Sequence, residues 1–444
     1  MKLLNRLFLV GAALLGLGAC GDDDKPNVPS QPDTPPVAQE ASSALIYQAN
    51  PRMFASRNCL DAITARVPEI AGMDATILYV MPIYEPGVEK SVNSPYCIKS
   101  FTDINARYGS KEDLRELVTA AHSAGLKVML DWVANHASWD NTWVKEHPDW
   151  FVRDAGGNMV SPNGWSDVVQ LNFENASLRK AMTDAMVYWV REFGIDGYRC
   201  DFADGPTHQF WQEAITALRA QKQDIIMFAE SKDTGLYKDG FDMVFGWGYG
   251  DALKKLFAGG ATSKFFEASA SELSGVPQGK SIVRYVLNHD VAAENDIATL
   301  YGSVDALPAA YCLTTMMGGT PMFYVGMEST QERGKMNFFN YSPITFSSTR
   351  HAQYAAIDKA YRATADLREA KILPYETGRV ATFVRTSGSK SVLVMVNTDK
   401  AEQTARTPIT LTGAPVTDLI TGTDMTLAAT VTLPGYGYKV MVTK

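Results

Sequence analysis

Eight short apolar runs, separated by amphipathic helical patterns, are the feature that most constrains the fold of this chain. The runs lie at residues 43–52, 75–83, 127–136, 194–202, 225–230, 241–249, 282–290 and 320–328. Apolar strands that alternate with helices predict a parallel sheet covered on both faces. Eight such units predict an α/β fold of the (β/α)8 or TIM-barrel class. The alternative is an open doubly wound sheet, although no glycine-rich phosphate-binding turn follows the first run.

The helical pattern is clearest in SKEDLRELVTAAHSAG, residues 110–125. Ser110 is a good N-cap, and Asp113 stands three residues later, as in a capping box. An apolar stripe at helical spacing follows, and Gly125 suits the C-terminus. This segment is therefore predicted to be a helix packed against the barrel.

The pattern changes at two places outside the regular alternation. The longest insertion, residues 137–172, follows the third strand. Residues 43–371 are thus predicted to form one barrel domain with a short insertion after its third strand. Residues 372–444 alternate apolar and polar positions with period two, which predicts a C-terminal antiparallel β-sandwich. Tryptophans gather in the insertion, where they form either a small core or a wall for stacking against a sugar. They are Trp139, Trp143, Trp150 and Trp165.

The first 42 residues differ from the rest. Lys2 and Arg6 precede an apolar run that is too short to span a bilayer, which predicts a signal peptide over residues 1–20. The sequence LGAC resembles the bacterial lipobox, in which the cysteine, here Cys20, is lipidated after cleavage; the alternative is an ordinary signal peptide. Residues 21–42 are acidic and proline-rich and are predicted to be a solvated tether. Its acidic start resembles the export tag of surface lipoproteins in some Gram-negative anaerobes, so we expect an outer-membrane lipoprotein facing the cell surface, with a periplasmic orientation as the alternative.

Charge and cysteine content restrict the partners. The net charge is −8 and no Lys/Arg run occurs, which argues against a nucleic-acid partner. Four further cysteines, Cys59, Cys97, Cys200 and Cys312, show no metal-type spacing. A Cys59–Cys97 disulfide is left open, and Cys200 should face the helices because it alternates with its charged neighbours.

Polar side chains cluster at the ends of the third, fourth, fifth and seventh strands. They are Asp131, Asn135, His136, Arg199, Asp201, Glu230, His289 and Asp290. In a barrel these C-terminal ends meet on the face that carries active sites. Paired carboxylates without a serine or cysteine nucleophile motif predict glycoside hydrolysis. Asp201 should stay ionised beside Arg199, whereas Glu230 ends an apolar run and should keep its proton.

Four ordered motifs carry a resemblance to a known family. DWVANH (131–136), GYRCD (197–201), FAE (228–230) and NHD (288–290) resemble the signature regions of the α-amylase family, glycoside hydrolase family 13. The resemblance implies a retaining α-glucan hydrolase that cleaves α-1,4 bonds of starch or malto-oligosaccharides through a covalent glycosyl intermediate. The alternatives are an α-1,6-glucosidase or pullulanase-type enzyme, a transglycosylase, and a non-catalytic glucan-binding lipoprotein.

The resemblance also implies roles for single residues. Asp201 would be the nucleophile, Glu230 the acid/base, and Asp290 the third catalytic carboxylate, which binds sugar hydroxyls. Five further residues would bind or organise the substrate site: Tyr96, Asp131, His136, Arg199 and His289.

The resemblance leaves cofactors and partners partly open. No cofactor is needed for the chemistry, and a structural calcium stays open because Asn135 matches a calcium-ligand position of the family. The Lys-His pair that many members have after the nucleophile is replaced by Asp204-Gly205, and the Asp154–Asn158 turn offers other oxygen ligands. The expected partners are an α-glucan, the membrane through Cys20, and outer-membrane glycan-uptake proteins.

Overall fold

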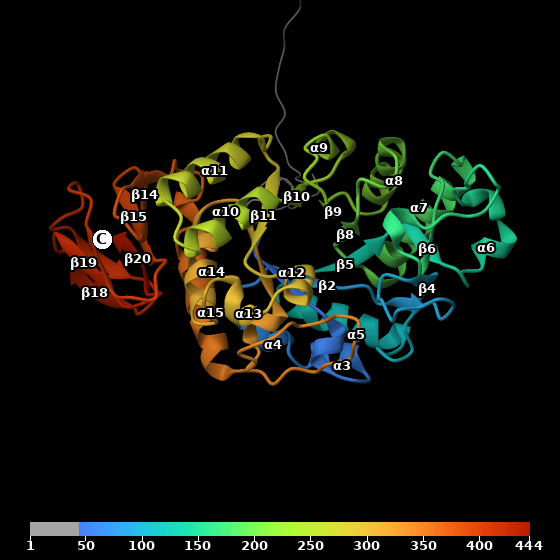
Figure 1. Ribbon diagram of the computed structural model, residues 1–444, viewed down its shortest axis with the longest axis horizontal. Coiled ribbons are helices and arrows are strands. Elements are labelled where there is room, and N and C mark those ends of the chain that lie inside the picture. The colour runs from blue at the N-terminus through green and yellow to red at the C-terminus, as the bar shows by residue number, and fades with distance from the viewer. Residues whose placement is uncertain (1–43) are drawn as a thin grey trace, which may run out of the picture. The chain divides into compact units, whose positions relative to one another are not determined.

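The computed structural model describes residues 44–444, and a closed barrel of eight parallel strands lies at its centre (Figure 1). The strands are β1 (Ile46–Ala49), β2 (Ile77–Val80), β5 (Lys127–Val133), β8 (Gly197–Asp201), β9 (Ile226–Ala229), β10 (Met243–Phe245), β11 (Ser281–Tyr285) and β12 (Thr320–Tyr324). Their order around the barrel is β1-β12-β11-β10-β9-β8-β5-β2, with every pair parallel. Each strand overlaps one of the eight predicted runs, and only β11 extends beyond its run, by the single residue Ser281. The barrel prediction is confirmed, and the open doubly wound sheet is wrong.

Alternation along the strands separates two apolar layers. Ile77, Met129 and Phe228 belong to a cluster inside the barrel, whereas Leu78 and Leu130 belong to the layer between strands and helices. This period of two is the ordinary geometry of a strand buried on both faces. Cys200 lies in the outer layer, as its position in the sequence predicted.

Helices cover the outside of the barrel. They are α2 (Pro51–Phe54), α3 (Cys59–Thr64), α4 (Val67–Gly72), α5 (Lys111–Ser123), α7 (Ala176–Phe193), α8 (His208–Gln221), α9 (Leu236–Asp239), α10 (Trp247–Phe257), α11 (Thr262–Ser274), α12 (His289–Glu294), α13 (Ile297–Leu300), α14 (Ala306–Met316) and α15 (Ser348–Ala363). Helix α5 begins with the predicted capping box: Ser110 Oγ accepts from the Asp113 amide, and Asp113 Oδ2 accepts from the Ser110 amide. Gly125 follows its end with a φ of +80°.

Two short antiparallel pairs extend beyond the strand ends. Strands β3 (Tyr84–Pro86) and β4 (Ile98–Ile104) form one, and β6 (His136–Ser138) and β7 (Val168–Gln170) form the other. The second pair frames the predicted insertion, which also contains α6 (Trp143–Glu146). The insertion brings its loop to the rim where the barrel strands end.

The tryptophans of the insertion show both of the predicted arrangements, a small buried core and an exposed aromatic surface. Trp150 is buried, and its ring packs edge-on against Trp143, which stacks on Phe101. These rings form a small core beneath the loop. Trp165, in contrast, is 39% exposed on the side of the loop that faces the barrel rim.

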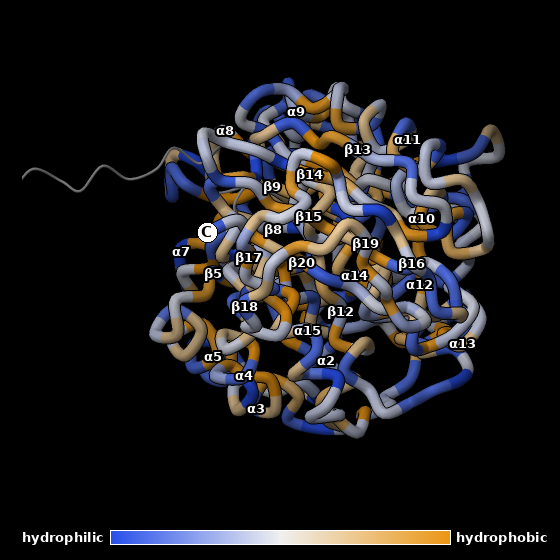
Figure 2. Tube along the Cα trace, turned by 90° about the vertical axis from the view of Figure 1, so that its left-hand side faces the viewer, coloured by the Kyte–Doolittle hydropathy of each residue, from blue (hydrophilic) through white to orange (hydrophobic). Residues whose placement is uncertain are grey.

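The C-terminal part is an antiparallel sheet of six strands with a two-stranded ribbon. The strands are β13 (Leu373–Tyr375), β14 (Val380–Ser387), β15 (Lys390–Asn397), β16 (Gln403–Arg406), β17 (Pro415–Asp418), β18 (Thr423–Thr426), β19 (Thr430–Leu433) and β20 (Tyr438–Thr443). One face of the sheet shares an apolar cluster with the β16–β19 ribbon, as Met395 and Val431 show. The other face, which includes Val394, belongs to the same apolar core as the buried side chains of α14. The sheet lies over this helix in Figure 2.

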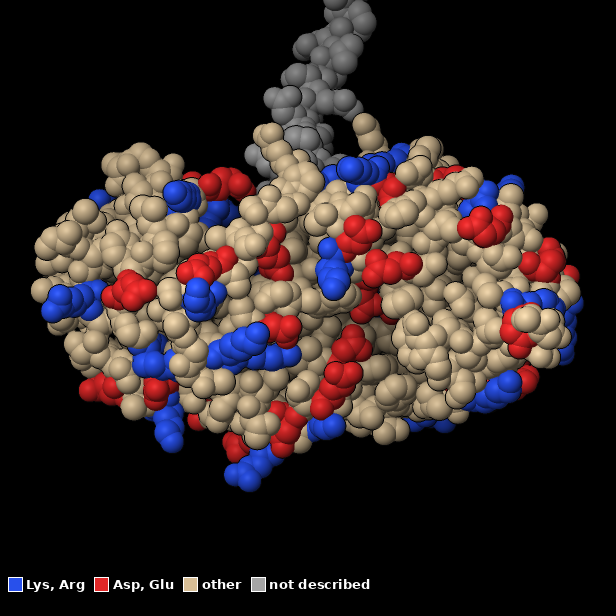
Figure 3. Space-filling model, turned by 45° about the horizontal axis from the view of Figure 1, so that its top comes forward, with Lys and Arg blue, Asp and Glu red and all other residues tan. Residues whose placement is uncertain are grey.

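The predicted N-terminal segment and the remaining sequence features compare with the structure as follows from residues 44–444. Cys20, the predicted signal peptide and the predicted tether lie outside the described residues. Cys59, Cys97, Cys200 and Cys312 are buried free thiols, so the Cys59–Cys97 disulfide is not formed. None of the helices in residues 44–444 combines the length and the apolar character needed to cross a bilayer. Acidic and basic groups are interspersed over the face shown in Figure 3.

Candidate active site

The C-terminal ends of four barrel strands bring the predicted site residues together. In the parallel register of β5 and β8, Asp131 stands opposite Arg199, and Val133 stands opposite Asp201. Strand β9 delivers Glu230 immediately after its last residue, Ala229. Helix α12 begins at His289, shortly after the end of β11, and carries Asp290 in its first turn.

Arg199 is the cation that three of these carboxylates share. Its Nη1 lies 2.7 Å from Asp131 Oδ1 and 3.0 Å from Asp201 Oδ1. Its Nη2 lies 2.7 Å from Glu230 Oε1, in an ion pair that lacks hydrogen-bond alignment. The Arg199 side chain exposes no surface. A buried guanidinium is stable only where opposite charge compensates for lost solvation, so this arrangement ties its three partners into one unit.

A second set of polar contacts supports Asp131 and His289. Tyr79 and Tyr96 donate hydrogen bonds of 2.6 Å and 3.0 Å to Asp131 Oδ2. The Tyr96 hydroxyl also lies 2.7 Å from His289 Nε2, and Gln48 Nε2 lies 2.9 Å from His289 Nδ1. Through these bonds the ends of β1 and β2 fix groups on β5 and α12.

The residue after Asp201 positions Glu230 through its backbone. Phe202 has a positive φ of 40°, and its N–H donates a hydrogen bond of 2.8 Å to Glu230 Oε2. A non-glycine residue in this region is strained, and such strain concentrates at functional sites. Because of this bend, strand β8 carries the Asp201 carboxylate into the site, and the backbone N–H of the next residue, Phe202, holds the Glu230 carboxylate.

The protonation preferences of this unit differ from the prediction. Burial, together with the charge of Glu230, raises the pKa of Asp201 well above its usual range, although Arg199 opposes the shift. Burial also acts to raise the pKa of Glu230, but Arg199 and the Phe202 amide outweigh it, so that this pKa is lowered. The prediction that Asp201 is ionised and Glu230 protonated is therefore wrong for the substrate-free protein. Arg199 reaches Glu230 as well as Asp201, which the sequence did not reveal, and a protonated Asp201 donates to Glu230.

Asp290 and the two histidines complete the rim. Burial and the charge of Glu230 raise the pKa of Asp290 to about 7, although 43% of its side-chain surface is open to the site. Burial lowers the pKa of both His136 and His289 to about 4. Both imidazoles are thus neutral at pH 7, which suits hydrogen bonding to a neutral ligand rather than ion pairing.

Trp165 adds an aromatic wall to this rim. Its ring centroid lies 5.5 Å from that of His136 and 5.4 Å from that of Phe202, edge-on in both cases. A partly exposed indole beside a polar pocket offers a flat apolar surface, which complements the face of a sugar ring. The stacking reading of the insertion therefore applies to Trp165, and the core reading to Trp150.

The Asn135 side chain, at the position where the resemblance leaves a calcium open, packs closely against Gly205. Gly205 lies so close that a Cβ built on it would stand 2.0 Å from Asn135 Oδ1. The Asp154 carboxylate accepts hydrogen bonds from the amides of Gly156 and Asn158 within its own turn. Calcium needs six to eight oxygen ligands. Nowhere in residues 44–444 do three or more His, Cys, Asp or Glu side chains gather as a metal site.

Comparison with known proteins identifies the family. The sequence model of the alpha-amylase catalytic domain matches residues 58–170 and 162–371, which is most of the chain. The chain belongs to the α-amylase family. It is a glycoside hydrolase, as the family model and the relatives indicate.

Sequence relatives agree with this assignment, and a solved structure agrees with the fold. A cyclomaltodextrinase of Geobacillus thermopakistaniensis is 25% identical over 410 residues, covering 85% of this chain and 69% of the relative. The α-amylase MalA of Haloarcula japonica is 26% identical over 414 residues, covering 86% of this chain and 59% of the relative. The crystal structure of an α-amylase from Lactobacillus plantarum superimposes with a TM-score of 0.81 at 23% identity, covering 91% of this chain and all of that one.

The structure brings together the predicted catalytic and substrate-binding residues of this glycoside hydrolase, and it adds three residues that sequence reasoning missed. Tyr96, Asp131, Arg199, Asp201, Glu230 and His289 are linked by the contacts described above. Asp290 joins them through Oδ1, which lies 3.3 Å from His289 Nε2, and His136 joins them through its own Nε2, which lies 3.2 Å from the Tyr96 carbonyl. The missed residues are Gln48, Tyr79 and the Phe202 amide. Gln48 and Tyr79 carried a detectable signal, because both are polar groups near the ends of apolar strands.

Proposed function

We propose that this chain is a retaining α-glucan hydrolase that cleaves α-1,4 bonds of starch or malto-oligosaccharides. The observation that carries the proposal is that Asp131, Asp201 and Glu230 all lie within ion-pair distance of the one buried guanidinium of Arg199. Asp290 lies on the same rim. Retaining hydrolysis needs a carboxylate nucleophile and a carboxylic acid about 5 Å apart. The names of the relatives, cyclomaltodextrinase and α-amylase, support an α-glucan as the substrate class.

In the proposed reaction, Asp201 attacks the anomeric carbon while Glu230 gives its proton to the departing glycosidic oxygen. Because the proton prefers Asp201 in the empty site, substrate binding has to move it to Glu230. A sugar placed between the two carboxyls would replace their mutual hydrogen bond with one from Glu230 to the glycosidic oxygen. Glu230 would then take a proton from water, which hydrolyses the glycosyl–Asp201 ester.

The other residues bind and orient the sugar in this proposal. Asp290, His136 and His289 hydrogen-bond its hydroxyl groups, and Tyr96 lies beneath it. Trp165 covers a neighbouring sugar unit. The proposed reaction uses side chains alone and no cofactor, and the chelator arm of the experiment below tests whether a calcium is needed.

Product analysis tests the proposal. The purified protein is given maltoheptaose, soluble starch, a cyclic maltodextrin, pullulan and isomaltotriose, with and without chelator, beside Asp201→Asn. Cleavage of maltoheptaose or starch by the wild type alone, with release of the α-anomer seen by NMR, would support it. Cleavage confined to pullulan or isomaltotriose would favour the α-1,6 alternative, and products longer than the substrate would favour transglycosylation. Binding without turnover would identify a capture protein.

We also propose that the protein is an outer-membrane lipoprotein anchored at Cys20, working beside glycan-uptake proteins. The support is the LGAC sequence and the acidic stretch after it. Metabolic labelling with a fatty acid tests the anchor: the wild type should carry label, and Cys20→Ala should not. Protease added to intact cells then distinguishes surface exposure from a periplasmic orientation.

A further inference from the structure

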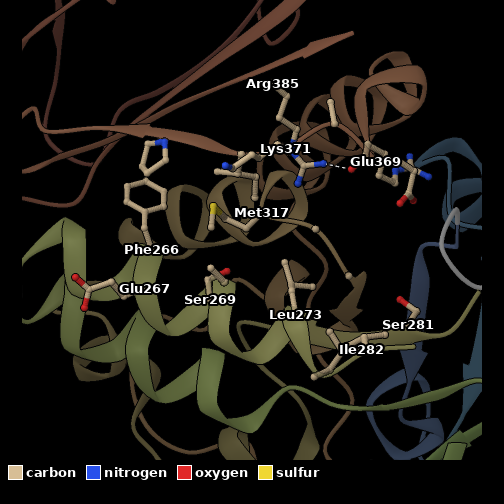
Figure 4. A pocket seen from close by; sticks show the side chains of 18 of the residues that line it. Phe266, Glu267, Ser269, Leu273, Ser281, Ile282, Met317, Glu369, Lys371 and Arg385 are labelled. Carbon is tan, nitrogen blue, oxygen red and sulfur yellow. Dashed lines mark hydrogen bonds between the residues drawn. The ribbon is translucent and has the colours of Figure 1, made fainter. Parts of the chain in front are cut away.

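A large cleft lies away from the catalytic rim. Its volume is about 1010 Å³, and it is bounded by α11, the start of β11, the turn at 317–319 and the segment 368–376 (Figure 4). Ser281 is the first residue of β11 and lines the cleft, whereas Asp290 follows the end of that strand. The cleft therefore opens at the opposite end of the barrel from the carboxylates.

Apolar side chains from several elements line this cleft. They are Phe266 and Leu273 of α11, Ile282 of β11, Met317, Ile372 and Pro374. Few aromatic faces are among them, so the lining is poorly suited to a glucan, which stacks on flat rings. Its size and apolar character are those of pockets that take small organic ligands.

Arg385 of β14 carries a charge into this lining without an acidic partner. Its side chain is 5% exposed and donates one hydrogen bond, from Nη1 to the Arg368 carbonyl. Its Nε has no hydrogen-bond partner, and no carboxylate of residues 44–444 forms an ion pair with it. Glu369 lines the same cleft but stays outside ion-pair distance.

Arg284 provides an internal comparison. It is also fully buried, and it lies near the same turn, donating to the carbonyls of Met317 and Gly318. Its Nη2, however, lies 3.0 Å from Glu272 Oε2. The fold thus pairs one buried arginine with a carboxylate and leaves the other unpaired beside open space. Burying an unpaired guanidinium is costly, and an anion in the cleft would remove that cost.

We propose that this cleft binds an organic anion that joins a carboxylate to an apolar body. The carboxylate accepts from the Arg385 guanidinium, and the apolar body lies along Leu273, Ile282 and Met317. The cleft lies at the other end of the barrel, so this ligand is not the substrate. The proposal is independent of which glycosidic bond the enzyme cleaves.

Calorimetric titration of the full chain tests the proposal with three probes. Octanoate has both parts of the proposed ligand, 1-octanol lacks the charge, and acetate lacks the apolar body. We expect octanoate to bind at one site per chain and more tightly than either of the others. Arg385→Gln should weaken octanoate at least ~10-fold, because a hydrogen-bonded charge is lost, whereas Arg385→Lys should retain part of the affinity. Arg406→Gln, on an exposed position of β16, is the matched control and should leave binding unchanged.

A second variant guards against misfolding of the first. Ala270 lines the cleft from an exposed position on α11, so Ala270→Trp places a bulky indole in the cleft without disturbing a packed core. It should also abolish octanoate binding. The proposal is overturned if octanoate does not bind, if octanol binds as tightly as octanoate, or if Arg385→Gln and Ala270→Trp both bind octanoate like the wild type.

Discussion

Nη2 of Arg199 lies 2.7 Å from Oε1 of Glu230, and the two residues come from the neighbouring strands β8 and β9. The arginine therefore neutralises the acid/base candidate as well as the nucleophile candidate. This contact explains why the pKa of Glu230 is lowered in the empty site in spite of burial. Because Arg199 compensates for their negative charge, it also allows several carboxylates to lie in one pocket.

The first prediction concerns the stability that Arg199 provides. Arg199→Gln removes the buried cation and leaves its carboxylates uncompensated, so unfolding should cost about 3–5 kcal/mol less at pH 8. The loss should be smaller at pH 5, because carboxylates that lose a cation take up protons more readily as the pH falls. Denaturant unfolding at both pH values measures it. Arg115→Gln, which breaks an exposed ion pair with Glu112, should cost less than about 1 kcal/mol. Equal losses in the two variants would contradict this account.

The second prediction separates the two roles of the insertion's tryptophans. Trp165→Ala should raise the KM for maltoheptaose roughly 3- to 10-fold, as expected for a lost stacking surface, with little change in kcat. Trp150→Ala removes a buried ring and should destabilise the protein by about 3–5 kcal/mol. Steady-state kinetics and thermal unfolding of both variants make the comparison. A variant of Trp165 that unfolds as readily as that of Trp150 would show that both belong to the core.

The sequence was sufficient for the architecture because strand periodicity and strand-end chemistry are local signals. Eight apolar runs predicted eight strands, and polar residues at the ends of four of them predicted where Arg199, Asp201 and Glu230 would meet. What stayed hidden depends on distances across the barrel. The reach of Arg199 to Glu230, the bend at Phe202 and the contact of Gly205 with Asn135 each arise from three-dimensional packing. The pKa order of the carboxyls follows from these contacts, so the predicted order failed.

The third prediction concerns acid stability. Burial lowers the pKa of His136 and His289 to about 4 in the folded protein, whereas an unfolded histidine titrates near ~6.5. Between these values the unfolded chain binds protons that the folded protein refuses, so stability is lost as the pH falls from about 6.5 towards 4. His136→Gln should make this pH dependence shallower. Urea unfolding at several pH values tests it, with His122→Gln, which changes a 42% exposed side chain, as the control. Parallel curves for wild type and His136→Gln would refute the assignment.

The fourth prediction tests the close contact between Gly205 and Asn135, at the position where the resemblance leaves a calcium open. Gly205→Ala would place a Cβ 2.0 Å from Asn135 Oδ1, so it should destabilise the protein by about 1–3 kcal/mol through overpacking. Asn135→Ala removes the obstructing amide, and the double variant should therefore be more stable than the sum of the single losses predicts, with a coupling of about 0.5–3 kcal/mol. Gly72→Ala is the matched control, because its Cβ would meet nothing within 4 Å, and in a helix it should be neutral or slightly stabilising. Additive losses at residues 135 and 205 would mean that Gly205 is required for a reason other than its contact with Asn135.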